Sequence, residues 1–303
     1  MVILCPIRRF KPQSYIELKN ICIALKVVRN QSTVDLSHKI HGPSPTANGE
    51  AIFVLHGLLG SQRNWQSMSA KIASHMNKPV VAVDARNHGD SPHSDEHDYL
   101  SLAADVSRLI AKVSTKKNVV IGHSMGGRTG MVLALTEPSK VASLIVVDIS
   151  PIIPESGRLL DFFPKVINAM NGVDFSGADS LHKARNAAKK QLTGLFKNEA
   201  SLYFILMNIG KLSDNSIGWK CNVKALKEHF PKIAAFPNMT GKTYDGPTLF
   251  IGGKLSDYLP PGDITGIKKL FPNAKLVYVE GAGHNVHIED PKVFFNEVVR
   301  FIS

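Results

Sequence analysis

Short, almost wholly apolar runs alternate with amphipathic segments along most of this chain of 303 residues. Such runs are typical of strands buried on both faces of a parallel sheet, whereas apolar residues spaced by three and four are typical of helices. The apolar runs predict eight strands, the first two as a β-hairpin: Ile21–Val28, Val34–Ile40, Ala51–Leu55, Pro79–Asp84, Asn118–Ile121, Val141–Ile149, Pro247–Ile251 and Lys275–Val279. The amphipathic segments predict helices at Ser61–His75, Leu100–Val113, Met125–Leu135, Leu181–Phe196, Val223–Phe230 and Pro291–Ile302. This alternation predicts the α/β class, with a mostly parallel eight-stranded sheet flanked by helices.

The alternation stops between residues 151 and 245, where we find helical segments and no convincing buried strand. An insertion between two late strands of an open parallel sheet lies over the carboxyl ends of the strands, where such folds bind ligands. We therefore expect a core of residues 21–150 and 246–303, and a helical cap of residues 151–245 over the site.

Composition narrows the class of protein further. Hydrophobic residues make up 44% and charged residues 20%, an ordinary globular balance. The three cysteines, Cys5, Cys22 and Cys221, are widely spaced and include no CxxC pair, which favours a reducing compartment and argues against structural zinc. The net charge of +11 is scattered instead of gathered into one basic run, so we expect no nucleic acid as partner. No apolar run reaches the roughly 18 residues of a transmembrane helix.

Residues 1–16 contain Arg8, Arg9 and Lys11 and no acidic residue. A basic, acid-poor beginning is typical of a mitochondrial presequence, so we expect residues 1–20 to be a targeting segment. The alternative is a short basic tail before the first strand, because Pro6 and Pro12 weaken an amphipathic helix.

The motif Gly122-His123-Ser124-Met125-Gly126 matches G-x-S-x-G and stands between a predicted strand and a predicted helix. A sharp strand-to-helix turn crowds its neighbours, and glycines two residues before and after the serine relieve that crowding. The turn presents the hydroxyl above the sheet, so Ser124 is the candidate nucleophile.

Acyl transfer through a serine needs two fixed N–H donors for the tetrahedral oxyanion. We assign one to the Met125 backbone and the other to the Leu58 backbone, in His56-Gly57-Leu58-Leu59-Gly60 after an earlier strand. His56 and His123 are expected to organise this region, without catalytic roles.

His284, in the glycine-rich loop after the last strand, is the candidate base, because the nucleophile precedes the histidine in this chain order. His287 is its nearest competitor.

Two residues remain candidates for the acid of the triad. Asp257 lies near the commoner acid position, which is occupied by Ser256, whereas Asp148 ends a buried apolar strand. We favour Asp148, because a carboxylate at the end of such a strand is costly without a strong partner.

These motifs, with the Asp84–Ser91 box that we interpret as architectural, resemble the α/β-hydrolase superfamily from about residue 20 onward. "HGLLGSQRNW" at 56–65, "DARNHGDSPHS" at 84–94 and "GHSMGG" at 122–127 resemble the mitochondrial α/β-hydrolase domain-containing protein 11 group, itself similar to bacterial short-chain esterases and yeast ethanol acetyltransferases. The resemblance implies esterase, lipase or thioesterase chemistry, a mitochondrial matrix address and Asp148 as the acid. Asp257 departs from the group's pattern and keeps that assignment open.

The expected activity is hydrolysis of carboxylic ester or thioester bonds in small acyl or lipid substrates, through a Ser124–Asp148–His284 triad, without metal or organic cofactor. Alternatives are acyl transfer to an alcohol and a non-catalytic protein that shields a partner. Phe162, Phe163, Leu202, Phe204 and Leu206 of the cap are candidates for an acyl pocket. A mitochondrial protein partner is compatible with this picture, and the sequence leaves the oligomeric state open.

Overall fold

The computed structural model describes residues 32–152, 158–196 and 198–303. The chain divides into two units, residues 1–33 and residues 34–303, and the elements described below belong to the second. The expected targeting segment and the predicted strand Ile21–Val28 lie outside the described residues.

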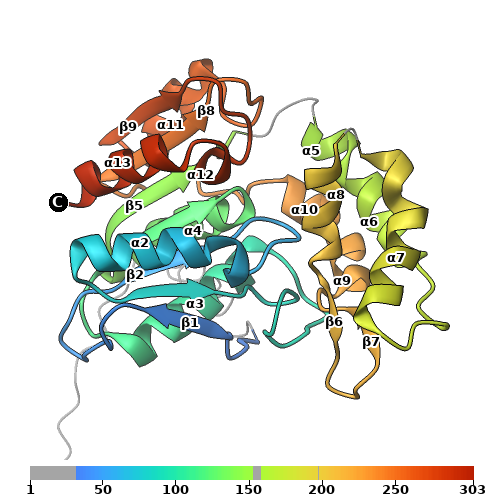
Figure 1. Ribbon diagram of the computed structural model, residues 1–303. Helices are drawn as coiled ribbons and strands as arrows, with labels where there is room; N and C mark the ends of the chain where they lie inside the picture. The colour runs from blue at the N-terminus through green and yellow to red at the C-terminus, as the bar shows by residue number, and fades with distance from the viewer. Residues whose placement is uncertain (1–31, 153–157, 197) are drawn as a thin grey trace, which may run out of the picture. The chain divides into compact units, whose positions relative to one another are not determined.

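The central sheet has seven strands in this part of the chain, in the order β1-β3-β2-β4-β5-β8-β9 (Figure 1). Neighbouring strands are parallel, apart from the antiparallel pair β1 and β3. Their bounds are β1 His38–His41, β2 Ile52–Leu55, β3 Val80–Val83, β4 Asn118–His123, β5 Val141–Val147, β8 Thr248–Gly253 and β9 Ala274–Val279. They correspond to seven of the eight predicted strands.

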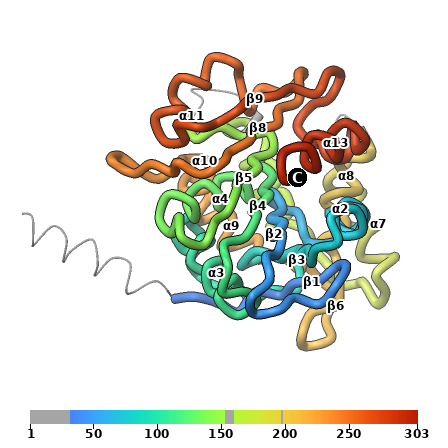
Figure 2. Tube along the Cα trace, turned by 90° about the vertical axis from the view of Figure 1, so that its left-hand side faces the viewer, coloured from blue at the N-terminus to red at the C-terminus, as the bar shows by residue number. Residues whose placement is uncertain are grey.

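Helices cover both faces of this sheet, which explains why its inner strands β2 and β3 are apolar and buried at every position. In β2, Ile52 and Val54 pack into one buried cluster with α2 and α13, whereas Phe53 and Leu55 pack into the other with α3 and α4. Figure 2 shows the two groups of helices on opposite sides of the strands. The helices outside the insertion are α2 Gln66–Met76, α3 Tyr99–Val113, α4 Met125–Thr136, α11 Ile264–Leu270, α12 Val286–Glu289 and α13 Pro291–Ile302.

Residues between β5 and β8 form an insertion of short helices. Its described elements are α5 Arg158–Asp161, α6 Phe163–Asn171, α7 Leu181–Leu192, α8 Glu199–Leu206, β6 Ile209–Lys211, β7 Ile217–Trp219, α9 Val223–Glu228 and α10 Phe230–Ala234. The insertion also contains an antiparallel pair of partly buried strands, β6 and β7, which were not predicted because three residues are too few to give a periodic signal.

Three helix predictions extended across a break. The segment predicted as Leu181–Phe196 is α7 followed by a 3₁₀ helix, η3 Thr193–Leu195. The segment predicted as Ser61–His75 begins as a 3₁₀ helix, η1 Gln62–Trp65, before α2. The segment predicted as Val223–Phe230 ends at Glu228, and α10 starts at Phe230 with Pro231 in its first turn. Proline lacks the amide hydrogen that a continuous helix needs, so a new helix begins there.

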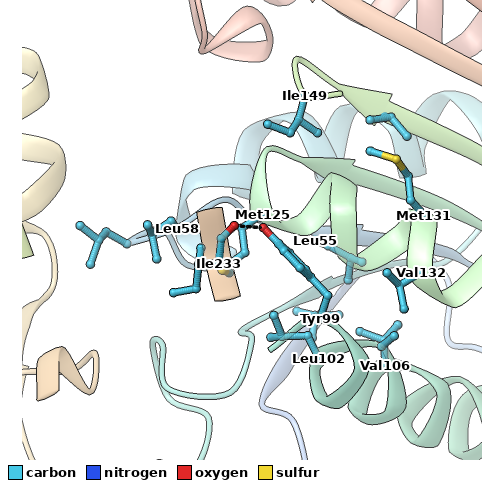
Figure 3. Packing of buried hydrophobic residues seen from close by; sticks show 14 of the residues in the cluster. Leu55, Leu58, Tyr99, Leu102, Val106, Met125, Met131, Val132, Ile149 and Ile233 are labelled. Carbon is cyan, nitrogen blue, oxygen red and sulfur yellow. Dashed lines mark hydrogen bonds between the residues drawn. The ribbon is translucent and has the colours of Figure 1, made fainter. Parts of the chain in front are cut away.

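Buried polar contacts hold the insertion against the sheet. The Tyr99 hydroxyl of α3 donates to the Ile233 carbonyl at 2.7 Å, in the apolar packing of Figure 3. The buried Arg128 side chain of α4 donates to the carbonyls of Ala234 (2.8 Å) and Ser150 (3.1 Å). These bonds fix α10 over the carboxyl ends of the strands. Among the described residues, no helix has the length and apolar character needed to cross a lipid bilayer.

Candidate active site

Ser124 lies at the junction of β4 and α4 with a φ of 52°, in the left-handed region that residues other than glycine seldom adopt. A Cβ atom on Gly122 would lie 2.2 Å from the Gly126 carbonyl oxygen, and a Cβ on Gly126 would lie 2.3 Å from the Leu55 carbonyl oxygen. Both positions therefore require glycine for the turn to close. Ser124 lines a cavity that His284 also lines.

Asp148 follows β5 with a φ of 50° and is fully buried. The carboxylate accepts three hydrogen bonds: Oδ1 accepts from the Gly253 amide at 2.8 Å, and Oδ2 accepts from the Ser256 hydroxyl and from His284 Nδ1 at 2.7 Å. Because the carboxylate accepts, Nδ1 of His284 carries the hydrogen and Nε2 keeps the lone pair that a general base uses. The alternative acid, Asp257, is exposed to solvent. The geometry thus favours Asp148 as the acid.

Aromatic and imidazole rings fix the position of His284. Its ring stacks on that of Tyr258 with centroids 3.9 Å apart. His123 Nε2 donates to the His284 carbonyl at 2.9 Å, which ties the base to the residue before the nucleophile. Burial, aided by the nearby His284 and His287, holds the pKa of His123 well below its usual value, so His123 stays neutral. His123 thus has a supporting contact, as expected.

Glu289 of α12 holds the loop that carries His284. One carboxylate oxygen accepts from the Gly283 amide at 2.6 Å and the other from the Asn285 amide at 3.1 Å, so the carboxylate spans both neighbours of the histidine. Charge-assisted bonds to backbone amides are about twice as strong as neutral ones. Sequence reasoning missed this residue because its only signal was an acid five positions after the histidine.

We expect Glu289→Ala to lower kcat about tenfold, because misplacement of a catalytic group by about 1 Å costs up to a hundredfold. The matched control is Glu280→Ala, whose carboxylate pairs at the surface with Lys254 at 3.4 Å. Steady-state ester hydrolysis at fixed pH measures both variants. Equal kcat values for them would contradict a positioning role for Glu289.

The loop after β2 supplies the first expected oxyanion donor. Gly57 approaches the nucleophile closely, since a Cβ on Gly57 would lie 3.2 Å from the Ser124 Cβ. The Gly57 carbonyl accepts from His56 Nδ1 at 2.7 Å and from the Gly60 amide at 3.0 Å. This carbonyl shares a peptide plane with the Leu58 N–H, so the two bonds fix the direction in which that N–H points.

The next residue of this loop is fixed from two sides. The Leu59 amide donates to His88 Nε2 at 3.1 Å, and the Leu59 carbonyl accepts from the Asn208 side chain of the insertion at 2.8 Å. Burial lowers the pKa values of His56 and His88, so both rings remain neutral and keep these bonds.

The second expected donor is the Met125 amide, at the first position of α4. No carbonyl of the helix can accept a hydrogen bond from an amide at this position.

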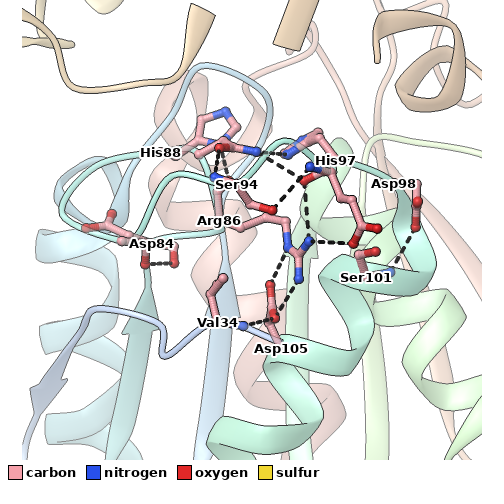
Figure 4. A network of polar contacts seen from close by, with 12 residues as sticks. Val34, Asp84, Arg86, His88, Ser94, His97, Asp98, Ser101 and Asp105 are labelled. Carbon is pink, nitrogen blue, oxygen red and sulfur yellow. Dashed lines mark hydrogen bonds and ion pairs between the residues drawn. The ribbon is translucent and has the colours of Figure 1, made fainter. Parts of the chain in front are cut away.

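The Asp84–Ser91 box lies beneath this loop and has structural contacts. Asp84 accepts from the Gln62 amide at 2.7 Å and the Asp90 amide at 2.9 Å. Arg86 donates to both oxygens of Asp105, at 2.6 and 2.9 Å, and both side chains are fully buried (Figure 4). These bonds join the loop after β3 to η1 and α3, which agrees with the architectural interpretation.

The cavity above Ser124 has a volume of about 520 Å³, within the usual range for small-molecule sites. The insertion contributes five large apolar residues to its lining, with Asn198, Ala200 and Ser201 beside them: Phe162, Phe163, Phe196, Phe204 and Ile205. The prediction that Leu202 and Leu206 line it was wrong. They are buried inside the insertion, because they lie on the other face of α8 from Phe204. Within the described ranges, no three histidine, cysteine or acidic side chains are placed to hold a metal ion.

Comparison with known proteins gives consistent matches. Residues 50–291 match the model of a family described as "alpha/beta hydrolase fold". The chain is 38% identical over 253 residues to the Mus musculus protein named "sn-1-specific diacylglycerol lipase ABHD11", covering 84% of this chain and 81% of that one. It is 28% identical over 302 residues to "Ethanol acetyltransferase 1" of Eremothecium cymbalariae, covering 92% and 84%. A solved structure titled "Marine microorganism esterase" is 35% identical, with a TM-score of 0.79 over 89% of this chain and all of that chain.

Proposed function

We propose, from the premise that the chain belongs to the α/β-hydrolase family, that it is a serine hydrolase of carboxylic esters. The observation that carries the proposal is the buried bond from His284 Nδ1 to Asp148, with Ser124 and His284 lining one cavity. This arrangement supplies a nucleophile, a base and a group that orients the base. The similarity to a mouse lipase and to a marine esterase supports ester substrates.

The proposed mechanism follows from these positions. Nε2 of His284 accepts the Ser124 proton as the hydroxyl oxygen attacks the ester carbonyl. The Leu58 and Met125 amides hold the oxyanion, and Asp148 stabilises the imidazolium. The imidazolium then protonates the leaving alcohol. Water, deprotonated by His284, releases the acid from the acyl-enzyme and regenerates the serine.

The apolar wall of the insertion supports substrates with hydrocarbon acyl chains. We assign the acyl chain to the wall that contains Phe162, Phe163 and Phe204, and we propose acylglycerols as substrates because the mouse relative is named as a diacylglycerol lipase. A rate screen over p-nitrophenyl esters, diacylglycerols and acyl thioesters of one chain length tests this assignment. Faster turnover of thioesters than of both oxygen esters would contradict it.

Transfer of the acyl group to an alcohol is the second candidate, because the chain is similar to an ethanol acetyltransferase. Product analysis in water containing ethanol separates the two. We expect free acid to remain the main product at low ethanol concentration. Ethyl ester as the main product would favour acyl transfer. A folded protein that does not react with a fluorophosphonate probe would instead favour a non-catalytic binding role.

We also propose a mitochondrial matrix location, supported by the basic, acid-free residues 1–16. Residues 1–20 fused to a fluorescent protein are expected to direct it into mitochondria. A fusion that stays outside mitochondria would remove the support for this location.

A further inference from the structure

His287 is a buried imidazole of the cavity that the proposed mechanism does not use. It lies in α12, and 5% of its surface is exposed. Its ring is parallel to that of Trp65, with an angle of 2° between the planes and 4.1 Å between the centroids, and Phe294 contacts it edge-on. The orientation of the ring is therefore fixed by aromatic packing.

Neither ring nitrogen of His287 has a hydrogen-bond partner in the part of the chain that the structure describes. Nδ1 is closed off from solvent without a partner. Nε2 is not closed off in this way, and His287 belongs to the lining of the cavity together with Ser124 and His284. Buried polar groups in proteins are nearly always hydrogen-bonded, so an unpaired imidazole in a substrate cavity requires an explanation.

The electrostatic setting makes His287 a neutral hydrogen-bonding group and not a second base. Burial, aided by the nearby His284, lowers the pKa of His287 to about 3. The carboxylate Asp148 is bonded to His284, which leaves His287 without a comparable partner to stabilise an imidazolium. A neutral ring with its hydrogen on Nε2 donates into the cavity, and it does so throughout the neutral pH range.

Polar side chains gather in the part of the cavity lining around His287. The insertion contributes the phenylalanine-rich wall to which we assign the acyl chain. The elements η1 and α12 meet where Trp65 stacks on His287. Besides Trp65 and Ile288, they contribute Asn64, His287 and Glu289 to the lining, and Asn285, which precedes α12, lines the cavity too. With the scissile bond at Ser124, an acyl chain on the phenylalanine-rich wall places the alcohol part of the ester toward this polar wall.

We propose that His287 binds a hydroxyl oxygen on the alcohol part of the substrate, and that this contact selects esters of polyols such as glycerol over esters of simple alcohols. The inference rests on the proposed esterase function. A site that hydrogen-bonds a substrate hydroxyl discriminates strongly against analogues that lack it, since its own polar group is then left unpaired.

The test compares 1-octanoylglycerol with propyl octanoate, which have the same acyl chain and the same three-carbon alcohol skeleton and differ by two hydroxyl groups. We expect wild-type kcat/KM to favour the glyceryl ester by at least about tenfold. In His287→Phe, which keeps an aromatic ring on Trp65 and removes both nitrogens, the ratio is expected to fall to about threefold or less, while p-nitrophenyl octanoate turnover changes less than about threefold. His287→Gln, which keeps an N–H donor, is expected to restore part of the ratio.

The matched control is His75→Phe, the same substitution at an exposed histidine of α2, which should leave the ratio unchanged. A wild-type protein that hydrolyses both octanoates equally would overturn the proposal, as would a His287→Phe protein with an unchanged ratio. Equal loss of all three substrates would assign His287 a structural role and overturn it too. Absence of fluorophosphonate labelling and of turnover with every ester would refute the proposed function, and the inference with it.

Discussion

The Ser124→Ala protein is expected to lose ester hydrolysis almost completely, with kcat reduced by about 10⁶-fold, as in other serine hydrolases that lack their nucleophile. The reason is geometric. The strained turn at Ser124, with a φ of 52°, places this residue in the lining of the cavity that His284 also lines. Without the serine hydroxyl, catalysis is limited to the oxyanion donors and substrate binding, which retain about 10³- to 10⁴-fold over water.

The measurement is p-nitrophenyl octanoate hydrolysis together with fluorophosphonate labelling. The control is Ser139→Ala, at an exposed serine of the turn before β5, which should keep both activities. Thermal unfolding of the two variants should remain similar, since neither change opens a cavity in the core. Labelling that persists in Ser124→Ala would show that another residue is the nucleophile.

The second large effect is expected at Asp148. Asp148→Asn should lower kcat by about 10⁴-fold, because an asparagine no longer enforces the tautomer of His284 that leaves Nε2 free to accept a proton. The surrounding contacts add to the loss. All three groups that face this carboxylate are donors, so the NH₂ of an asparagine would meet one of the Gly253 amide, the Ser256 hydroxyl and His284 Nδ1–H.

Asp257→Asn is the matched control and should change kcat by less than about threefold, as a surface substitution away from the reacting groups usually does. Both variants are measured by steady-state kinetics on the same ester, with unfolding curves to show that they are folded. A larger loss in Asp257→Asn than in Asp148→Asn would reverse the assignment of the acid.

The supporting contacts of the site were the hardest part to derive from the chain. The serine and the two glycines of the nucleophile turn lie within five consecutive residues, and their position at a strand-to-helix junction identifies them locally. Ser256 and Glu289 carry no comparable local signal. Ser256 donates to a carboxylate 108 residues away, and Glu289 acts on backbone amides whose direction depends on the loop conformation. Likewise, Leu202 and Phe204 are both apolar residues of one helix, and only the packing of α8 decides which of them faces the cavity.

The amino-acid sequence by itself determined the alternation of strands and helices, the place of the insertion and the candidates Ser124, His284 and Asp148, because periodicity and short motifs depend on neighbouring residues. The tertiary structure decided which groups meet. It joined Asp148 to His284 across 136 residues and placed Asn208 of the insertion on the oxyanion loop. It also left Nδ1 of the buried His287 without a partner among the described residues. Hydrogen bonds and burial depend on distances in space, and the order of the six parallel strands in the sheet sets those distances without leaving a pattern along the chain.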